Sequence, residues 1–281
     1  GRVIAALIAE QKMGPPQIDL TDRQGDRHRL WMVTHPEVLQ RLQQAMIDRP
    51  LYIADGHHRY DSALTYRREK AAQTAGFTGE EGFNFVMMSL VNFSDPGLVI
   101  LPPHRLVRGI SRAMLASLKS QLEAFFEITE FPLWMPDIWQ KVDSFLTGIK
   151  PDKPHVSLAV YGLDDDRLQV LTLRDVSTTD RLMPCFHSSL YKKLDVSLVD
   201  HVILEKLLAF NKEKEEVTLA YSYDRLDAVN RVKNQQYQMV FILNPVMPEL
   251  IKSIADSGDR MPRKSTYFYP KSPAGLVFYR W

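Results

Sequence analysis

Residues 53–60 read Ile-Ala-Asp-Gly-His-His-Arg-Tyr and join an apolar run to an expected helix through a single glycine. The apolar residues 51–54 suit a short buried strand. From Tyr60 onward, residues recur at helical spacing, which predicts a helix that ends near Gly76. The stretch is therefore expected to form a strand-to-helix turn.

The side chains of this turn suit a phosphate site. A helix N-terminus offers unpaired backbone N–H groups and the positive end of the helix dipole, and Gly56 lets the backbone approach a ligand. Arg59 can grip phosphate oxygens through two parallel hydrogen bonds, and His57 or His58 can donate a hydrogen bond or move a proton near neutral pH. Asp55 can orient an imidazole, cap the helix or hold a magnesium ion. In the alternative interpretation Asp55 only caps the helix and both histidines are solvated loop residues.

The metal chemistry of the turn favours magnesium over zinc. No pair of histidines shows the i, i+4 spacing of a zinc protease, and the adjacent side chains of His57 and His58 point apart. Magnesium carried by a nucleotide needs only one or two carboxylates besides phosphate oxygens, and Asp55 is the candidate ligand.

Three separated motifs resemble a known prokaryotic family. They are Ala-Asp-Gly-His-His-Arg-Tyr at 54–60, Leu-Pro-Pro-His-Arg at 101–105 and Met-Pro-Arg-Lys-Ser-Thr-Tyr-Phe-Tyr-Pro-Lys at 261–271. In this order they resemble domain-of-unknown-function family 1015 over nearly the whole chain. The shorter Asp-Gly-His-His-Arg string is similar to the phosphate-binding turn of the ParB/sulfiredoxin superfamily, in particular its free-serine kinase branch. This resemblance implies ATP or ADP with magnesium as cofactor, and free serine as the first substrate to test.

The chain also departs from these relatives. Sulfiredoxin has its reactive cysteine where this chain has His57, which argues against sulfinic acid repair. ParB carries Gly-Glu-Arg-Arg at this turn, which is absent here and argues against CTP hydrolysis. The serine kinases use a glutamate from an earlier segment as general base, and neither Glu10 nor Glu37 aligns with it. Because the chain begins Gly1-Arg2 and the family has a further upstream segment, we expect a fragment that lacks part of the site.

The composition agrees with an intracellular enzyme. The 281 residues suffice for two domains, and 45% hydrophobic content supplies ordinary cores. The 35 basic residues nearly balance 34 acidic ones, so no global field draws the chain to nucleic acid or to an acidic membrane. The partners that we expect, a small-molecule substrate and a nucleotide, follow from the turn and its resemblance instead. The single Cys185 excludes an internal disulfide framework, which suits a reducing cytoplasm.

Alternating strands and helices predict an α/β fold of the mixed α+β class. The resemblance implies a ParB/sulfiredoxin-like part over residues 1–102. A second mixed-sheet α/β domain is expected over residues 103–281, with the boundary near Pro102 and Pro103. Besides the helix after the turn, the expected helices cover residues 36–47, 110–126, 138–147, 196–210, 226–232 and 247–255. The expected strands cover a hairpin over 17–31, then 83–93, 98–101, 156–161, 168–173 (after a turn at 164–165), 218–223, 237–243 and 276–279.

A second concentration of polar chemistry lies near the C-terminus. Lys264, Ser265, Thr266 and Lys271 place two ammonium groups and two hydroxyls around an alternating aromatic run. They can hold phosphates or a carboxylate-bearing substrate across a domain cleft. The alternative interpretation is an ordinary strand flanked by exposed lysines.

His104 and Arg105 follow a di-proline turn, and the prolines would direct these side chains into the same cleft. The alternative is a surface pair at a domain joint. Asp195, Asp200 and His201 are weaker candidates, for which a structural role is favoured.

The leading hypothesis is a nucleotide-dependent phosphotransferase acting on a small hydroxylated metabolite such as free serine. Two other classes stay open. One is a non-catalytic nucleotide- or nucleic-acid-binding regulator of ParB type, supported by the basic residues Arg67, Arg68 and Lys70. The other is a metal-dependent phosphoester hydrolase.

Overall fold

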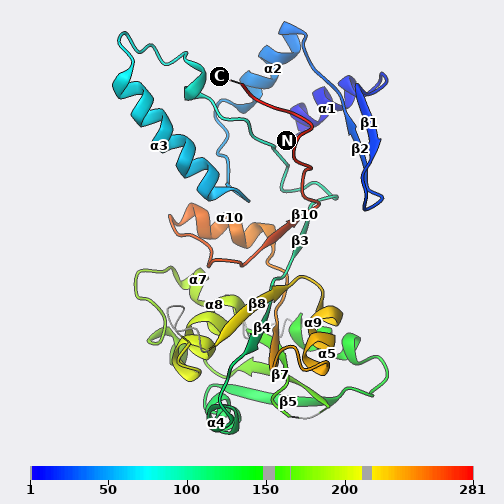
Figure 1. Ribbon diagram of the computed structural model, residues 1–281, viewed down its shortest axis with the longest axis vertical. Coiled ribbons are helices and arrows are strands. Elements are labelled where there is room, and N and C mark those ends of the chain that lie inside the picture. Colours follow the sequence, from blue (N-terminus) through cyan, green and yellow to red (C-terminus); the bar gives the residue numbers. More distant parts are fainter. Residues whose placement is uncertain (1, 148–155, 165, 211–216, 281) are drawn as a thin grey trace. The chain divides into compact units, whose positions relative to one another are not determined.

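A computed structural model describes residues 2–147, 156–164, 166–210 and 217–280 of the chain (Figure 1). The chain divides into two compact units. Unit 1 contains residues 1–92 with 279–281, and unit 2 contains residues 93–278. Helices combine with antiparallel sheets, which confirms the predicted α+β class. The predicted domain boundary near residue 102 stays a prediction.

Unit 1 contains helices joined to one hairpin. Its elements are α1 (Arg2–Gln11), β1 (Ile18–Thr21), β2 (Arg27–Leu30), α2 (Pro36–Met46), α3 (His57–Gln73) and the short helix η1 (Gly82–Asn84). The hairpin is confirmed, with Ile18 opposite Leu30, and an ion pair between Asp19 and Arg27 links the two strands. Pro36 at the first position of α2 suits a helix start, since its missing N–H would have no partner there.

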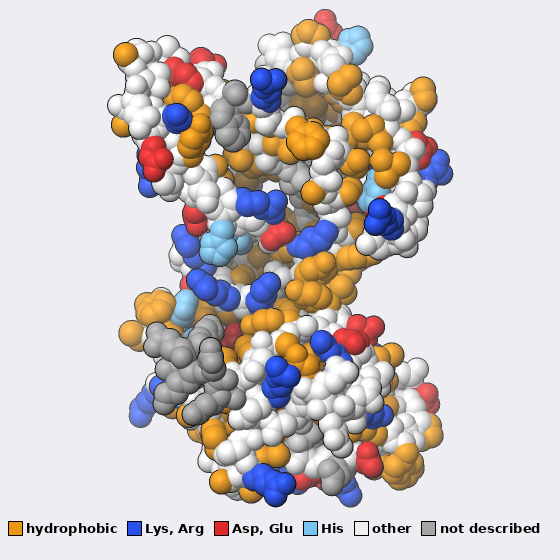
Figure 2. Space-filling model, viewed as in Figure 1, with side chains coloured by type: hydrophobic (Ala, Val, Ile, Leu, Met, Phe, Trp, Pro, Cys, Tyr) orange, Lys and Arg blue, Asp and Glu red, His pale blue; other side chains and the backbone are white. Residues whose placement is uncertain are grey.

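Two strand predictions in unit 1 are wrong. Residues 51–54 and 85–92 have no strand structure, and most of their side chains are exposed. Val91, for example, is 60% exposed, and Figure 2 shows apolar side chains at the surface of this unit. The apolar sequence is typical of a buried strand, but a strand forms only against a hydrogen-bonding neighbour, and the described residues of unit 1 provide none here. Leu7 is the one buried apolar residue among those described in this unit.

Unit 2 is built on a six-stranded sheet of order β5-β7-β6-β9-β4-β8. Its strands are β4 (His104–Arg108), β5 (Phe126–Pro132), β6 (Ser157–Tyr161), β7 (Arg167–Leu173), β8 (Thr218–Ser222) and β9 (Met239–Ile242). All pairings in it are antiparallel. β8 and β9 therefore run in the same direction on either side of β4, joined by α9 (Arg225–Lys233), and β5 and β6 flank β7 in the same way, joined by α5 (Ile138–Leu146). The alternation of strands and helices in the sequence thus reflects two split β-α-β units.

Helices cover both faces of this sheet. On one face α5 and α9 pack against residues such as Leu106, Val170 and Val240. On the other face, side chains such as Val107 and Phe241 pack with the remaining helices. These helices are α4 (Arg112–Glu123), α6 (Val176–Asp180), α7 (Ser189–Lys192), α8 (Asp195–Ser197), η2 (Leu198–Leu207) and α10 (Pro248–Asp256). The main core of the protein therefore lies in unit 2.

A small ladder joins two distant motifs within unit 2. β3 (Val99–Leu101) pairs antiparallel with β10 (Tyr267–Tyr269), with Tyr267 opposite Leu101 (Figure 1). The segment that ends with Arg105 and the segment that contains Lys264 are consequently neighbours.

Several boundaries in unit 2 differ from prediction. The helix expected to continue to residue 126 ends at Glu123, because Phe126 begins β5, which pairs with β7 and was not predicted. The helix expected over 196–210 is present, but η2 has the wider π-type turn, as in the hydrogen bond from the Leu208 N–H to the Ile203 carbonyl. The strand expected over 276–279 is absent from the described chain. The turn expected at 164–165 includes a residue outside the described ones.

Candidate functional site

The predicted strand-to-helix turn begins a helix, as expected. Gly56 is the residue before α3 and has a φ of 82°, in the left-handed region that glycine adopts without strain. No side chain caps the helix, and the first helical bond runs from the Tyr60 N–H to the Gly56 carbonyl. Within the described chain, the backbone N–H groups of His57, His58 and Arg59 have no hydrogen-bond partner. Such a helix start is an anion-binding arrangement.

Arg59 lies close to this helix start without a strong partner. Its Nη2 atom is 3.8 Å from Oδ2 of Asp55, and the two side chains are 81% and 57% exposed. Asp55 also accepts a hydrogen bond from the Gly56 N–H through Oδ1 at 2.9 Å, so it steadies the turn rather than capping the helix. An exposed ion pair of this length contributes little stability, and an anion can replace the carboxylate at Arg59.

Gly56 leaves room for the Arg59 guanidinium. A Cβ atom built on Gly56 would lie 2.9 Å from Nη2 and 3.1 Å from Nε of Arg59. We expect Gly56→Ala to displace the guanidinium and to weaken the binding of an anion at this turn about tenfold, as measured by calorimetric titration.

Gly56→Ala also strains the backbone, because alanine tolerates the left-handed conformation poorly. A matched variant separates this strain from the displacement of the guanidinium. Gly56→Asn carries the same Cβ atom, but asparagine tolerates the left-handed conformation better. Equal losses of affinity in both variants would assign the effect to the displaced guanidinium. Wild-type affinity in both would show that Arg59 does not need this position.

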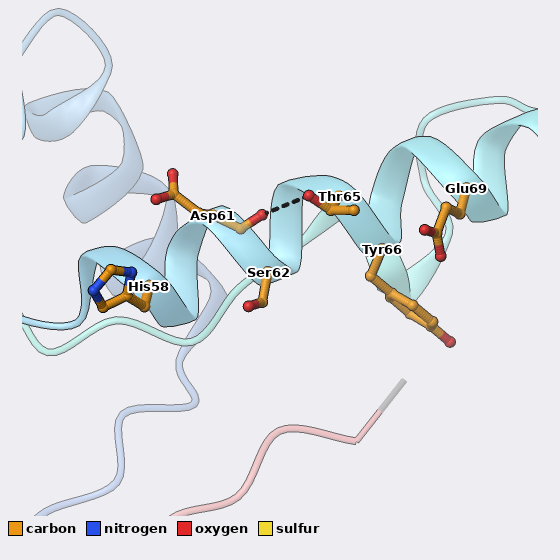
Figure 3. Close-up of a pocket in the computed structure, with 6 residues that line it drawn as sticks. All are labelled: His58, Asp61, Ser62, Thr65, Tyr66 and Glu69. Carbon is orange, nitrogen blue, oxygen red and sulfur yellow. Dashed lines mark hydrogen bonds between the residues drawn. The ribbon is translucent and has the colours of Figure 1, made fainter. Parts of the chain in front are cut away.

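A shallow depression of about 390 Å³ runs along α3 beside the turn (Figure 3). Its lining residues share one helical face and are His58, Asp61, Ser62, Thr65, Tyr66 and Glu69. The last five were not among the residues predicted from the sequence, although their i, i+3, i+4 spacing places them on one face of a helix. Figure 3 shows the Asp61 carboxylate directed away from Ser62 and Tyr66. Because these polar groups do not converge, the start of α3 is the stronger candidate site.

The predicted C-terminal site residues lie in unit 2. Lys264 is exposed and adopts a left-handed φ of 55°, while Ser265 is buried and its hydroxyl donates to the Pro262 carbonyl. Thr266 is half-buried and directly precedes β10. Nζ of Lys271 lies 4.6 Å from the centre of the Tyr267 ring. Lys264 is therefore presented at the tip of an anchored turn.

His104 and Arg105 are both buried, on opposite faces of β4. Nδ1 of His104 accepts a hydrogen bond from the Leu243 N–H at 3.1 Å. Burial, together with the charges of Arg225 and Arg105, lowers the pKa of His104 to about 4. Arg105 is fully buried and pairs with Asp200 through Nε at 3.1 Å. Direct substrate contact by these two side chains stays a prediction.

The structure thus brings some predicted residues together. The segments that contain Arg105 and Lys264 are neighbours in unit 2, where Nη2 of Arg105 lies 3.5 Å from the Arg263 carbonyl. Residues 55–59 belong to unit 1 and form a separate group.

Neither a multi-ligand metal site nor a membrane span is found in the described part of the chain. No group of three or more histidine, cysteine or acidic side chains could hold a metal there. None of the helices described combines the length and apolar character needed to cross a bilayer. Asp55 could supply at most one carboxylate to a magnesium ion that arrives with a nucleotide.

A family model matches residues 1–197 of the chain, and its description is "Protein of unknown function (DUF1015)". The match covers more than half of the chain, so the protein belongs to this family, as the sequence motifs at 54–60 and 101–105 indicate. The third motif, at 261–271, lies outside the matched residues. A search of curated proteins found no match.

Solved structures show distant similarity. A conserved hypothetical protein from Pyrococcus furiosus is 14% identical, with a TM-score of 0.40, over 94% of this chain and 80% of that chain. A free serine kinase in complex with AMP is 12% identical, with a TM-score of 0.41, over 94% of this chain and 77% of that chain. A mutant free serine kinase in complex with ADP is 13% identical, with a TM-score of 0.39 and the same coverage. At these TM-scores we draw no conclusion from them.

Proposed function

We propose that this protein is a nucleotide-dependent phosphotransferase for a small hydroxylated metabolite, with free serine as the first candidate. The observation that carries the proposal is the uncapped start of α3, where three backbone N–H groups without partners in the described chain adjoin the loosely held guanidinium of Arg59. Backbone amides, a helix dipole and a guanidinium together bind phosphate. The similarity of residues 55–59 to the serine-kinase turn supports the same assignment.

In this proposal the phosphates of ATP or ADP bind Gly56, His57, His58 and Arg59, and Asp55 contacts the accompanying magnesium ion. Lys264 and Lys271, in unit 2, are proposed to bind an anionic group of a small metabolite. The acceptor hydroxyl oxygen attacks the terminal phosphorus, its proton passes to His57 or His58, and the bond to the bridging oxygen breaks as the shortened nucleotide leaves. Catalysis is then mainly positioning and charge stabilisation.

Calorimetric titration of the full chain with Mg-ATP and Mg-ADP tests the phosphate site. Arg59→Ala should weaken nucleotide binding by about 10- to 100-fold, because it removes charge-assisted hydrogen bonds. Arg68→Ala, on the same helix but beyond its first turns, is the matched control and should bind as the wild type does. Equal affinity of the Arg59→Ala variant and the wild type would contradict the proposal.

An acceptor screen follows for a chain that binds nucleotide. Transfer to serine or another hydroxy acid should be lowered by Arg59→Ala, since this variant removes the guanidinium proposed to position the nucleotide phosphates. Nucleotide-independent release of phosphate from esters would favour the hydrolase alternative.

The nucleic-acid alternative has less support. Nε of Arg67, one of its basic residues, donates to the Asn84 side chain at 2.8 Å. A salt-sensitive complex with DNA or RNA that is lost in Arg67→Ala and Arg68→Ala would restore this alternative.

A further inference from the structure

Arg105 has no exposed surface, although it carries a permanent positive charge. It lies on β4, between β9 and β8, opposite Phe241 and Tyr221. Alternate residues of a strand share a face, so its side chain lies on the same side of the sheet as Val107, in the layer that contains η2. A guanidinium in this layer needs a counter-charge and acceptors for its N–H groups.

The partners of Arg105 come from four segments of the chain. Nε and Nη2 bind the two carboxylate oxygens of Asp200, in η2, at 3.1 and 3.2 Å. The guanidinium carbon lies 5.5 Å from the centre of the Tyr221 ring. Nη1 donates to the Pro103 carbonyl at 2.6 Å, and Nη2 also lies 3.5 Å from the Arg263 carbonyl. Asp200 neutralises the charge, and the remaining donors bind backbone.

The two carbonyls belong to two of the three motifs that the sequence contains. Pro103 lies in the Leu-Pro-Pro-His-Arg motif, and Arg263 directly precedes Lys264 in the third motif. An ion pair that only stabilised the fold could be replaced by apolar side chains with little loss of folding stability. Apolar side chains, however, cannot bind the carbonyl groups of two segments at once. The contacts of Arg105 therefore indicate a positioning role.

Lys264 needs such positioning. Its φ of 55° is unfavourable for a residue with a Cβ atom and persists only where the surroundings hold it. Pro262 and Ser265 are buried on either side, and their hydrogen bond closes the turn. Lys264 is exposed, and the described chain offers it no ion-pair partner. The ammonium group is thus free to meet an anion from solvent.

We propose that the buried Arg105–Asp200 pair holds the turn over residues 262–266 so that Lys264 is preorganised for a small metabolite bearing a carboxylate or a phosphate. Arg105 is then a positioning residue that acts through the Arg263 carbonyl. The identity of the ligand rests on the proposed function, whereas the ordering of the turn does not.

Limited trypsin digestion of the full chain tests the ordering of the turn. Arg263 and Lys264 are both exposed trypsin sites, and cleavage after either is identified by mass spectrometry. The double variant Arg105→Met/Asp200→Leu removes the pair without leaving a lone charge. Cleavage in the turn should become about tenfold faster, while the melting temperature stays near that of the wild type.

Binding is measured on the same proteins with O-phosphoserine as the probe. The double variant should bind it about tenfold more weakly than the wild type, and Lys264→Ala should match that loss. Arg105→Lys provides a second variant that keeps the buried charge but cannot span both carbonyls, and it should loosen the turn in the same way. Lys119→Met removes an ion pair with Glu130 and Asp164 elsewhere in unit 2, and it should change neither readout.

The two proposals fail in different ways. Unchanged cleavage in the turn of the folded double variant or of Arg105→Lys would overturn the positioning role, whatever the ligand. Faster cleavage with unchanged phosphoserine affinity would also overturn it, because the ordered turn would then serve no anion. If the wild type binds neither phosphoserine nor Mg-ADP, the proposed function fails, and the cleavage rates still decide whether Arg105 orders the turn.

Discussion

Replacing Asp200 alone with leucine should lower the free energy of unfolding by about 3 kcal/mol or more, because it leaves the Arg105 charge buried without a partner. Arg105 has no exposed surface, so water cannot replace the lost carboxylate without a rearrangement of the core. Asp200 itself is 25% exposed, so its carboxylate could still reach solvent in Arg105→Met. The loss in Arg105→Met should therefore be smaller than the loss in Asp200→Leu.

Urea unfolding of the wild type, both single variants and the double variant measures these differences as a double-mutant cycle. The double variant should recover most of the stability lost in Asp200→Leu, since neither charge remains. Lys119→Met is the control, because the Lys119 side chain is 37% exposed and its ion pairs should contribute less than about 1 kcal/mol. If Asp200→Leu were no less stable than the double variant, the carboxylate would not be what neutralises Arg105.

Several elements of unit 2 were predicted because their patterns are local, whereas the strands β4 and β5 were not predicted. The strands at 157–161, 167–173 and 239–242 are short apolar runs between polar turns, and α5 and α9 each have one apolar stripe. Their antiparallel order could not be read from the sequence. Strand neighbours are chosen by contacts between distant residues, and β4, which precedes the other strands of the sheet, pairs with the last two of them.

The failures in unit 1 have the same physical origin. Residues 85–91 have the composition of a buried strand, yet local composition does not supply the neighbouring strand that would bury them. The start of α3 needs no distant partner, because glycine in a left-handed turn and helical spacing are local signals. For that reason the start of α3 could be predicted from the sequence, whereas the surroundings of residues 51–54 could not.

The environment of Arg105 also could not be predicted from the sequence. An Arg after His in a polar motif is typical of a surface pair, and only the register of β4 and the placement of Asp200 in η2 reveal its burial. The motif was enough to select Lys264 as a candidate, but only the structure shows that its backbone is left-handed.

Acid should destabilise unit 2 through His104. The pKa of its imidazole is lowered to about 4 by burial, with the charges of Arg225 and Arg105 acting in the same direction, whereas an exposed histidine titrates near 6.5. Protonation of Nδ1 would also break the hydrogen bond from the Leu243 N–H. The unfolded chain binds this proton first, so stability is full above about pH 6.5 and is lost as the pH falls toward 4. The loss due to His104 should reach about 2 kcal/mol at about pH 4.5.

Asp195, which accepts a hydrogen bond from the amide after that of Leu243, has the opposite effect on stability in acid. The Asn244 N–H donates to Asp195 at 2.7 Å, and burial raises the pKa of this carboxyl to about 6. The folded chain then binds the Asp195 proton first, so acid stabilises the fold through Asp195 by about 2 kcal/mol over the same range. In the wild type the two contributions largely cancel, and only variants separate them.

Urea unfolding at about pH 7 and about pH 4.5 therefore needs three proteins. His104→Asn keeps an acceptor for the Leu243 N–H without the titrating ring, so relative to the wild type its stability should improve on acidification by about 2 kcal/mol. Asp195→Asn should shift by a similar amount in the opposite direction. If the free energy of unfolding depended on pH in the same way for all three proteins, burial would not hold either group in its neutral form.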